Sequence, residues 1–409
     1  MLDVVSLEEA RAAVLTRFAG WMDAQAVKTE TVPVERAAVR RIAKDVVAEE
    51  GVPPFNRSMV DGYAVVAADT FGCSEALPAL LTLAGEVTMG EAPAVACAAG
   101  TCVRIPTGGE LPAGADAVAM LEYCEDFGDG TIGVAKPCAP GENVVFANDD
   151  VAPGDVLIPA GTRLLPHHIG TLASLGVVNV ELTARPRVGI ISTGDEIVPV
   201  DTTPEGAQMR DVNEPMLAAT VAACGAVPVT YGIVPDDAEA LQGCLGVAMA
   251  NCDMVLISGG SSAGTKDNTS RVLEEVSELL FHGVAVKPGK PTMVADANGT
   301  PVFGLPGHPV AAYFMFLELV RPLLLGRSGD ADSVHVAAKL AVSIPSNHGR
   351  AEFVGVRLEE REGGAVAVPI RGKSGLISQL TGADGYLIIP RNCEGLAAGE
   401  PVDVRLFAR

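Results

Sequence analysis

Apolar and polar residues follow two different spacings in the first third of the chain. Over residues 6–20 the apolar positions recur with the period of an amphipathic helix, and Ser6 followed by Glu9 forms a capping-box signature at its start. Residues 51–140 instead show short apolar runs separated by Gly and Pro, with a hairpin-like GDG at 128–130. The pattern predicts an N-terminal helix followed by a β-rich module.

The second half of the chain alternates strand and helix patterns. Between residues 187 and 325 the strand-like runs are RVGIIST, VPVTYGIV, DMVLISGG and VFGLPG. Helical patterns follow them at about residues 214–224, 237–250, 269–279 and from 309 onward. Such a βα series favours a parallel, doubly wound sheet. From residue 335 onward, short strands bounded by Gly and Pro predict a small β-barrel or sandwich.

Length and composition set the class of protein. At 409 residues the chain is too long for one hydrophobic core and suggests two to four domains. With 48% hydrophobic and 20% charged residues, it has ample apolar surface to bury. The formal net charge of −22 repels polyanions, so we expect neither a nucleic-acid partner nor a membrane. A small anionic ligand stays open, because its site needs only local amides and a few cations.

The N-terminus and the cysteines predict a cytoplasmic protein. The opening MLDVVSLEEARAAV carries acidic residues where a signal peptide needs a basic start. The most apolar stretch, residues 310–325, contains Glu318 and Arg321 and predicts a buried helix rather than a membrane span. The nine cysteines form no CxxC pair and no zinc-like spacing, so we expect reduced thiols.

Three loops that follow predicted strands carry the candidate chemistry. They are TGDE at 193–196, SGGSSAGTKD at 258–267 and GLPGHP at 304–309. In an open α/β sheet, ligands bind outside the carboxyl ends of the strands, so these loops are expected to face one crevice. The SGGSSAG segment suits a phosphate, because glycine lets the backbone approach closely and serine adds donors. A flexible glycine-rich turn explains the same segment equally well, since the motif is neither GxGxxG nor a P-loop.

Acidic residues in and near these loops have two interpretations each. Asp195 and Glu196 suit Mg²⁺, which one carboxylate can bind, or they are simply solvated. Asp267 fits a metal ligand and also the N-cap of the helix that follows it. Asp236 with Glu239 fits a capping-box variant at the start of its helix.

Two lysines and one histidine are the candidate positively charged residues near the predicted crevice. Lys287 and Lys290 in KPGKP suit an anion, or else they lie on the surface. His308 is a titratable candidate between Gly and Pro, although a lone histidine is more often a packing or hydrogen-bonding residue. Upstream, PPFNRSMVDGYAV at 53–65 mixes aromatic with charged residues, and a buried turn does not explain the charged ones. As a bare pattern, TGGELPAGAD at 107–116 indicates only a structured turn.

Taken together, these loops resemble the MoeA family, whose eukaryotic counterpart is the E domain of gephyrin. The resemblance covers essentially the whole chain, in order, through PPFNRSMVDGYA, TGGELPAGADAV, STGDE, GIVPDD, SGGSSAGTKD, KPGKP, GLPGHPVAA and GLISQLTGADGYLIIP. It implies a homodimer whose subunits combine α/β and β domains. The expected parts are an N-terminal and linker domain (1–52 with 141–186), an inserted β-rich domain (53–140), a MogA-like molybdopterin-binding α/β domain (187–328) and a C-terminal β-barrel (335–409).

The resemblance also implies a function in molybdenum cofactor biosynthesis. The implied enzyme is a Mg²⁺-dependent molybdopterin molybdenumtransferase, which inserts molybdate into adenylylated molybdopterin and releases AMP. We expect the catalytic acids to be Asp61, Glu196, Asp236 and Asp267, and the Mg²⁺ ligands to be Asp195, Glu196 and Asp267. Further ligand contacts are expected from Thr107, Thr193, Gly194, Ser258, Gly259, Gly260, Ser261, Ser262, Gly264, Lys287, Lys290, Pro306, Gly307, His308 and Pro309. A MogA-type adenylyltransferase and apo-molybdoenzymes are the implied protein partners.

Two departures from the family leave the oxyanion open between molybdate and tungstate. The family commonly reads SGGVSVGxxD and GLPGNP, whereas this chain has the more polar SGGSSAGTKD and the titratable His308 in GLPGHP. Three alternatives also stay open: a MogA-like molybdopterin adenylyltransferase, a tungstate-preferring paralogue and a non-catalytic scaffold like gephyrin. The extra modules at 51–140 and 335–409 favour the transferase, and the acids retained in every loop disfavour a scaffold.

Overall fold

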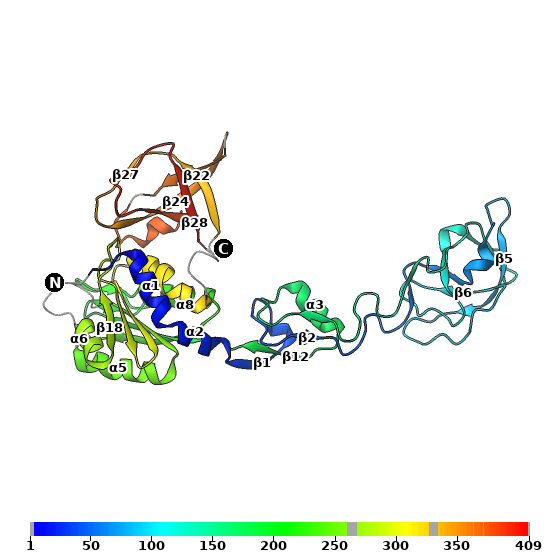
Figure 1. The fold of residues 1–409 in the computed structure, drawn as a ribbon, viewed down its shortest axis with the longest axis horizontal. Helices are drawn as coiled ribbons and strands as arrows, with labels where there is room; N and C mark the ends of the chain where they lie inside the picture. The colour runs from blue at the N-terminus through cyan, green and yellow to red at the C-terminus, as the bar shows by residue number, and fades with distance from the viewer. Residues whose placement is uncertain (1–3, 260–267, 327–333, 363, 371, 408–409) are drawn as a thin grey trace. The chain divides into compact units, whose positions relative to one another are not determined.

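Two compact units make up the chain (Figure 1). The computed structural model describes residues 4–259, 268–326, 334–362, 364–370 and 372–407. One unit contains Met1–Lys28 and Ala184–Arg409, and the other contains Thr29–Thr183. Each has hydrophobic cores of its own and is described by itself.

A six-stranded sheet forms the centre of the first unit. Its order is β16 (Val227–Val234), β13 (Arg187–Thr193), β17 (Met254–Ser258), β21 (Thr300–Leu305), β20 (Met293–Ala297) and β18 (Glu278–His282). The first four strands are parallel, as predicted. The pairings of β20 with β21 and of β18 with β20 are antiparallel, so the predicted parallel sheet ends in an antiparallel edge. The strand ELLFH was missed because it directly follows a helical pattern, and α6 (Asn268–Val276) ends before it.

Alternate residues of the parallel strands enter two different cores. Val188 and Ile190 of β13 lie in one core, whereas Ile191 lies in the other. Because both faces are buried, these strands show continuous apolar runs rather than alternation. The second core includes residues of α5 (Ala238–Asn251) and α6. The first includes residues of α1 (Leu7–Arg17), α4 (Asn213–Ala223), α7 (Pro309–Met315), the π-helical turn η4 (Phe316–Val320) and α8 (Arg321–Leu325).

The N-terminal helix begins at the predicted capping box. The Glu9 backbone N–H donates to Ser6 Oγ at 3.1 Å, and the Ser6 N–H donates to the Glu9 carboxylate at 2.7 Å. A short helix, α2 (Ala19–Ala26), follows α1. In the described part of the chain no helix is long and apolar enough to cross a membrane.

The order of the strands creates a switch point beside β13. After β13, the chain passes through α4 to β16 on one side, and then through α5 to β17 on the other side. The connections that leave the carboxyl ends of β13 and β17 therefore diverge. In open α/β sheets, such a divergence marks the sheet edge at which ligands bind.

The C-terminal region forms the predicted β-barrel. Its strands are β24 (Ala351–Arg361), β25 (Gly364–Pro369), β22 (His335–Leu340), β28 (Pro401–Leu406) and β26 (Gly385–Ile389), and pairing of β24 with β26 closes it. A parallel pairing joins β24 to β19 (Val286–Lys287). Smaller elements are β14 (Ile197–Val198) with β15 (Met209–Arg210), β23 (Ile344–Pro345) with β27 (Gly395–Leu396), and η5 (Ile377–Leu380).

A buried carboxylate joins three segments of this unit. Glu318 lies in the π-helical turn and is 2% exposed. It accepts hydrogen bonds from the Tyr386 hydroxyl at 2.7 Å and from Arg405 at 3.2 Å, and it pairs with Arg11 of α1. Because a buried charge is costly unless it is paired, this network holds the barrel and the N-terminal helix against the α/β core.

The second unit contains the β-rich module. Its six-stranded sheet runs β7 (Ala117–Met120), β4 (Gly62–Val65), β6 (Thr101–Ile105), β5 (Ala79–Glu86), β9 (Thr131–Val134) and β8 (Cys124–Asp126). The predicted GDG turn joins β8 to β9, with Gly128 and Gly130 at positive φ. Other elements are the pairs β1 (Thr29–Pro33) with β12 (Asn179–Thr183), β2 (Val46–Val47) with β11 (Val156–Ile158) and β3 (Arg57–Ser58) with β10 (Val144–Val145), and helix α3 (Pro166–Ser174).

Candidate functional site

The main chains of the loops after β13 and β17 are in close contact where the two strands end. Gly259, the first residue after β17, has φ +107°, and a Cβ on it would lie 2.1 Å from the Thr193 carbonyl oxygen. Gly307 in the loop after β21 is also close, since a Cβ on it would lie 3.6 Å from the Gly259 Cα. Only glycine fits position 259, because both the contact and the positive φ exclude a side chain. The three strand-end loops predicted from the sequence therefore come together here.

Asp236 joins this edge through the end of the neighbouring strand. Its carboxylate accepts a hydrogen bond from Thr193 Oγ1 at 2.8 Å, and its backbone N–H donates to Asp195 Oδ1 at 3.1 Å. The Asn268 side chain donates to the Asp236 carbonyl at 2.7 Å. The capping-box interpretation was wrong, because Asp237 caps α5 by accepting from the Ala240 N–H. The Asp236 side chain therefore lies with the predicted site.

Glu196 lies beside the same strand end. A Cβ on Gly194 would be 2.9 Å from Glu196 Oε2, which shows how closely the carboxylate folds over the backbone there. Within the described ranges, no group of three or more His, Cys, Asp or Glu side chains converges as a metal site. The expected ligand Asp267 lies outside those ranges, as do the predicted loop residues Gly260, Ser261, Ser262 and Gly264.

The loop after β21 contacts the C-terminal region. His308 precedes α7, which begins at Pro309, and His308 Nδ1 lies 2.8 Å from Ser374 Oγ. The Val310 N–H donates to the Ser374 carbonyl at 3.2 Å. Sequence reasoning did not name Ser374. Its only signal is a short glycine- and serine-containing loop, KSG, between two strands of the barrel.

The two predicted lysines lie in the segment between β18 and β20. That segment leaves the sheet at the same edge as the site, because Met293 of β20 pairs with Gly304 near the end of β21. Lys287 Nζ lies 2.8 Å from the Glu352 carboxylate, so its charge is compensated by the barrel. Lys290 is exposed. Of the two, Lys290 is the better candidate for an anion.

Two more residues missed by sequence reasoning lie at the start of α4. The Asn213 side-chain amide donates to Ser258 Oγ at 2.7 Å and to the Gly307 carbonyl at 2.8 Å. Asp211 accepts from the Asn213 N–H at 3.0 Å. The sequence signal is weak, since DVNEP is only an ordinary helix start.

Asp61 and Thr107 meet in the second unit. Asp61 precedes β4 and Thr107 follows β6, and these two strands are antiparallel neighbours. Asp61 Oδ1 accepts from the Thr107 N–H at 2.7 Å and from Thr107 Oγ1 at 3.0 Å. The backbone N–H of Thr107, followed by its hydroxyl, lowers the pKa of Asp61. Asp61 is therefore an exposed carboxylate that stays ionised at neutral pH.

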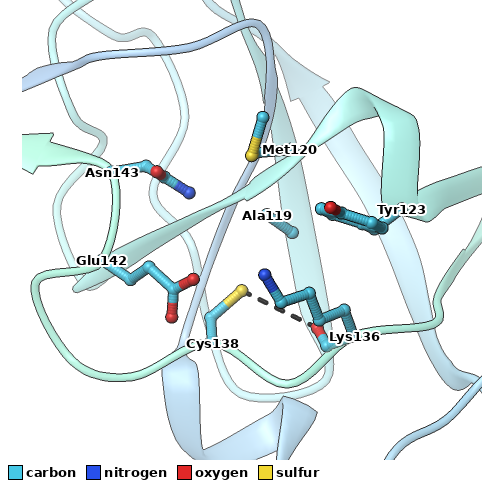
Figure 2. A pocket seen from close by; sticks show the side chains of 7 residues that line it. All are labelled: Ala119, Met120, Tyr123, Lys136, Cys138, Glu142 and Asn143. Atoms are coloured by element: carbon cyan, nitrogen blue, oxygen red, sulfur yellow. Dashed lines mark hydrogen bonds between the residues drawn. The ribbon is translucent and has the colours of Figure 1, made fainter.

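A small hollow in the second unit is lined by residues that include Tyr123, Lys136 and Cys138 (Figure 2). It has a volume of about 10 Å³, about the room that one water molecule needs. Lys136 lies over the Tyr123 ring at 4.7 Å, and burial raises the pKa of the Cys138 thiol to about 11. Such a thiol is protonated and unreactive at neutral pH. All nine cysteines are free thiols, as expected.

Family models cover this fold from one end to the other. The MoeA N-terminal region (domains I and II) matches residues 5–176, a probable molybdopterin-binding domain matches residues 189–326, and the MoeA C-terminal region (domain IV) matches residues 337–407. The strand-end site thus lies in a domain of the molybdopterin-binding class.

Relatives and solved structures give the same result. The chain is 35% identical to a putative molybdopterin biosynthesis protein of Methanocaldococcus jannaschii, over 99% of this chain and 98% of that protein. It is 32% identical to a molybdopterin molybdenumtransferase of Bacillus subtilis, over 93% and 90%. A crystal structure of the molybdopterin biosynthesis MoeA protein of Pyrococcus horikoshii matches with a TM-score of 0.83 and 37% identity over 100% of both chains. The chain therefore belongs to the MoeA family.

The Asp61–Thr107 contact predicts how Asp61 titrates. Thr107→Val removes the hydroxyl donor but keeps the backbone N–H, so the pKa of Asp61 should rise only part of the way toward its ordinary value. Because the folded-state pKa is lowered, any stabilisation from this contact is present above the ordinary carboxyl pKa and is lost as pH falls through the folded value. NMR titration of the Asp61 carboxyl carbon measures the shift.

A matched control is Thr101→Val, which removes a hydroxyl that bonds to a carbonyl rather than to a carboxylate. The control should leave the Asp61 titration as it is. An identical Asp61 pKa in wild type and Thr107→Val would show that the hydroxyl does not act on this carboxylate.

Proposed function

We propose that this protein is a molybdopterin molybdenumtransferase, which inserts molybdate into adenylylated molybdopterin and releases AMP. Membership of the MoeA family supports a role in molybdenum cofactor biosynthesis, and curated relatives carry this enzyme name. The observation that carries the proposal is the bare backbone contact of Gly259 with Thr193 at the switch point. It brings the loops after β13 and β17 together at the edge where open α/β sheets bind ligands, with acidic residues beside it.

The acidic residues at this edge fit Mg²⁺ as donors. Asp195, Glu196 and Asp236 supply hard carboxylate oxygens around the end of β13, and Asp195 is hydrogen-bonded to Asp236. We infer that Asp195, Glu196 and Asp267 hold the ion together with ligand phosphate. Bound there, Mg²⁺ would neutralise phosphate charge and polarise the linkage to AMP.

The chain's own groups have separable tasks in this proposal. Amides of the loop that begins at Ser258 bind the phosphate, with Thr193 and Gly194 forming the opposite wall. Asp236 holds the Thr193 hydroxyl in place through their 2.8 Å bond. The other end of the proposed site receives the oxyanion substrate, molybdate or tungstate. It is formed by Pro306, Gly307, His308, Pro309, Ser374 and Lys290.

We infer further that the protein acts as a homodimer in the cytoplasm. A MogA-type adenylyltransferase would supply its substrate, and apo-molybdoenzymes would take its product. Asp61 and Asp267 belong to different compact units. A site that needs both is proposed to form between two copies, with Asp61 from one and Asp267 from the other.

The reaction predicts AMP release that depends on all components. Purified protein with adenylylated molybdopterin, Mg²⁺ and molybdate should release AMP and yield cofactor that activates an apo-molybdoenzyme. Omitting Mg²⁺ should stop release, because the phosphate charge is then not neutralised. Replacing molybdate by tungstate in wild type and in His308→Asn measures the oxyanion preference.

Absence of AMP release under these conditions would refute the transferase proposal. Release of pyrophosphate from ATP and molybdopterin would instead support the adenylyltransferase alternative. Activity without change in the molybdate-to-tungstate ratio in His308→Asn would show that the imidazole does not select the oxyanion.

The shared site predicts recovery of activity in mixed dimers. Asp61→Asn and Asp267→Asn homodimers should fold but be nearly inactive, because every site loses one carboxylate. A mixed dimer has both lesions in one site and none in the other. After denaturation and refolding of equal amounts, about half of the dimers are mixed, so activity should reach roughly a quarter of wild type. Activity no greater than the mean of the two mutants, with mixed dimers confirmed by tag pull-down, would place the whole site in one chain.

A further inference from the structure

Asn213 makes two hydrogen bonds that join the end of β17 to the loop after β21. It is the first residue of α4 and is 7% exposed. Its side-chain amide donates to Ser258 Oγ at the end of β17, at 2.7 Å, and to the Gly307 carbonyl in the loop after β21, at 2.8 Å. Both amide hydrogens are used, so one side chain spans the two loops.

The parallel pairing of β17 with β21 sets the spacing of the strands as far as Ser258 and Leu305, and it ends before Gly259 and Gly307. Gly259 and Gly307 have no side chains that could pack, and a Cβ on Gly307 would lie 3.6 Å from the Gly259 Cα. The Gly259 N–H reaches the Leu305 carbonyl only at 3.4 Å, which is long for a hydrogen bond. Among the described residues, the amide of Asn213 is therefore a directional restraint between the two loops beyond the end of this ladder.

Asp211 fixes the position of the Asn213 backbone. Its Oδ1 accepts from the backbone N–H groups of Asn213 and Glu214, each at 3.0 Å. The Asp211 N–H donates to the Val198 carbonyl at 2.8 Å, in the strand that follows the TGDE loop. A connected set of bonds thus runs from the loop after β13 to the loops after β17 and β21.

Two oxygens of this set are buried and lack a donor in the described residues, namely Asp211 Oδ2 and Asn213 Oδ1. A buried acceptor without a donor costs stability. Both oxygens lie at the strand-end edge, beside the two loops that Asn213 joins.

We propose that Asn213 is a positioning residue for the phosphate-binding backbone. It sets the separation of Ser258–Gly259 from Gly307 through its two N–H donors, and it acts on the ligand only through that backbone. The inference rests on the proposed function, because it takes the phosphate of the adenylylated substrate as the ligand.

The test compares Asn213→Leu, which keeps the approximate shape and removes both donors, with wild type. We expect the KM for adenylylated molybdopterin to rise about tenfold, with a smaller change in kcat, because two ordinary hydrogen bonds are lost from the binding geometry. In the ligand-free protein, amide hydrogen exchange at Gly259 should quicken about tenfold. Exchange at Gly194, whose N–H bonds to Val234 on the far side of β13, should stay the same.

Two further variants make the result decisive. Asn251→Leu removes a similar amide-to-carbonyl bond on α5, at 2.8 Å to Val247, and should change neither KM nor exchange at Gly259. Ser258→Ala removes one of the two acceptors of the Asn213 amide, so it should raise KM less than Asn213→Leu does. If Asn213→Leu does not fold, Ser258→Ala tests the positioning role in its place. In the double variant Asn213→Leu/Ser258→Ala the two increases in KM should not add, because both substitutions remove the same Asn213–Ser258 hydrogen bond.

The ligand-free exchange separates this inference from the proposed function. Faster exchange at Gly259 in a protein whose wild type releases no AMP would support the positioning of the loop and refute the transferase. Unchanged exchange and unchanged KM in folded Asn213→Leu would overturn the positioning role, as would fully additive effects of Asn213→Leu and Ser258→Ala.

Discussion

The close contact between Gly259 and the Thr193 carbonyl is the constraint on which the site depends. A Cβ at position 259 would lie 2.1 Å from that oxygen, so the two diverging loops meet as bare backbone. The contact arises from topology, because β16 and β17 lie on opposite sides of β13 and the connections that leave β13 and β17 part at their carboxyl ends. Acidic side chains of Asp195, Glu196 and Asp236 collect around the same point. Bare backbone and carboxylate oxygens are thereby placed side by side.

The rest of the first unit keeps this edge in a fixed geometry. Both faces of the sheet are covered, with Ile190 in one core and Ile191 in the other. The barrel meets the edge through the His308–Ser374 and Lys287–Glu352 contacts, and the buried Glu318 network joins the barrel to α1. In a chain of net charge −22, Lys290 is the better placed of the two predicted lysines for an anionic ligand, because Lys287 is paired with Glu352. Local placement of charge, not the overall balance, suits this protein to a small anion.

Sequence reasoning reached the elements whose pattern is local. The parallel strands, the Ser6–Glu9 cap and the GDG turn each depend on residues a few positions apart, and all three are confirmed. The sequence predictions were wrong where a residue distant in the chain determines the local structure. ELLFH becomes a strand only by pairing with β20, and Asp237 rather than Asp236 caps α5 because Asp236 bonds to Thr193 instead. Asn213 and Ser374 were missed for the same reason, since their roles come from residues 45 and 66 positions away.

Ligand-induced protection of backbone amides tests the central claim most directly. Hydrogen exchange would be followed residue by residue, with and without adenylylated molybdopterin and Mg²⁺. If the edge at the ends of β13 and β17 binds the phosphate-bearing part of the ligand, protection should concentrate at Gly194, Asp236, Gly259 and the loop around Gly307. Binding that leaves all four positions unprotected would contradict the claim and place the ligand elsewhere on the protein.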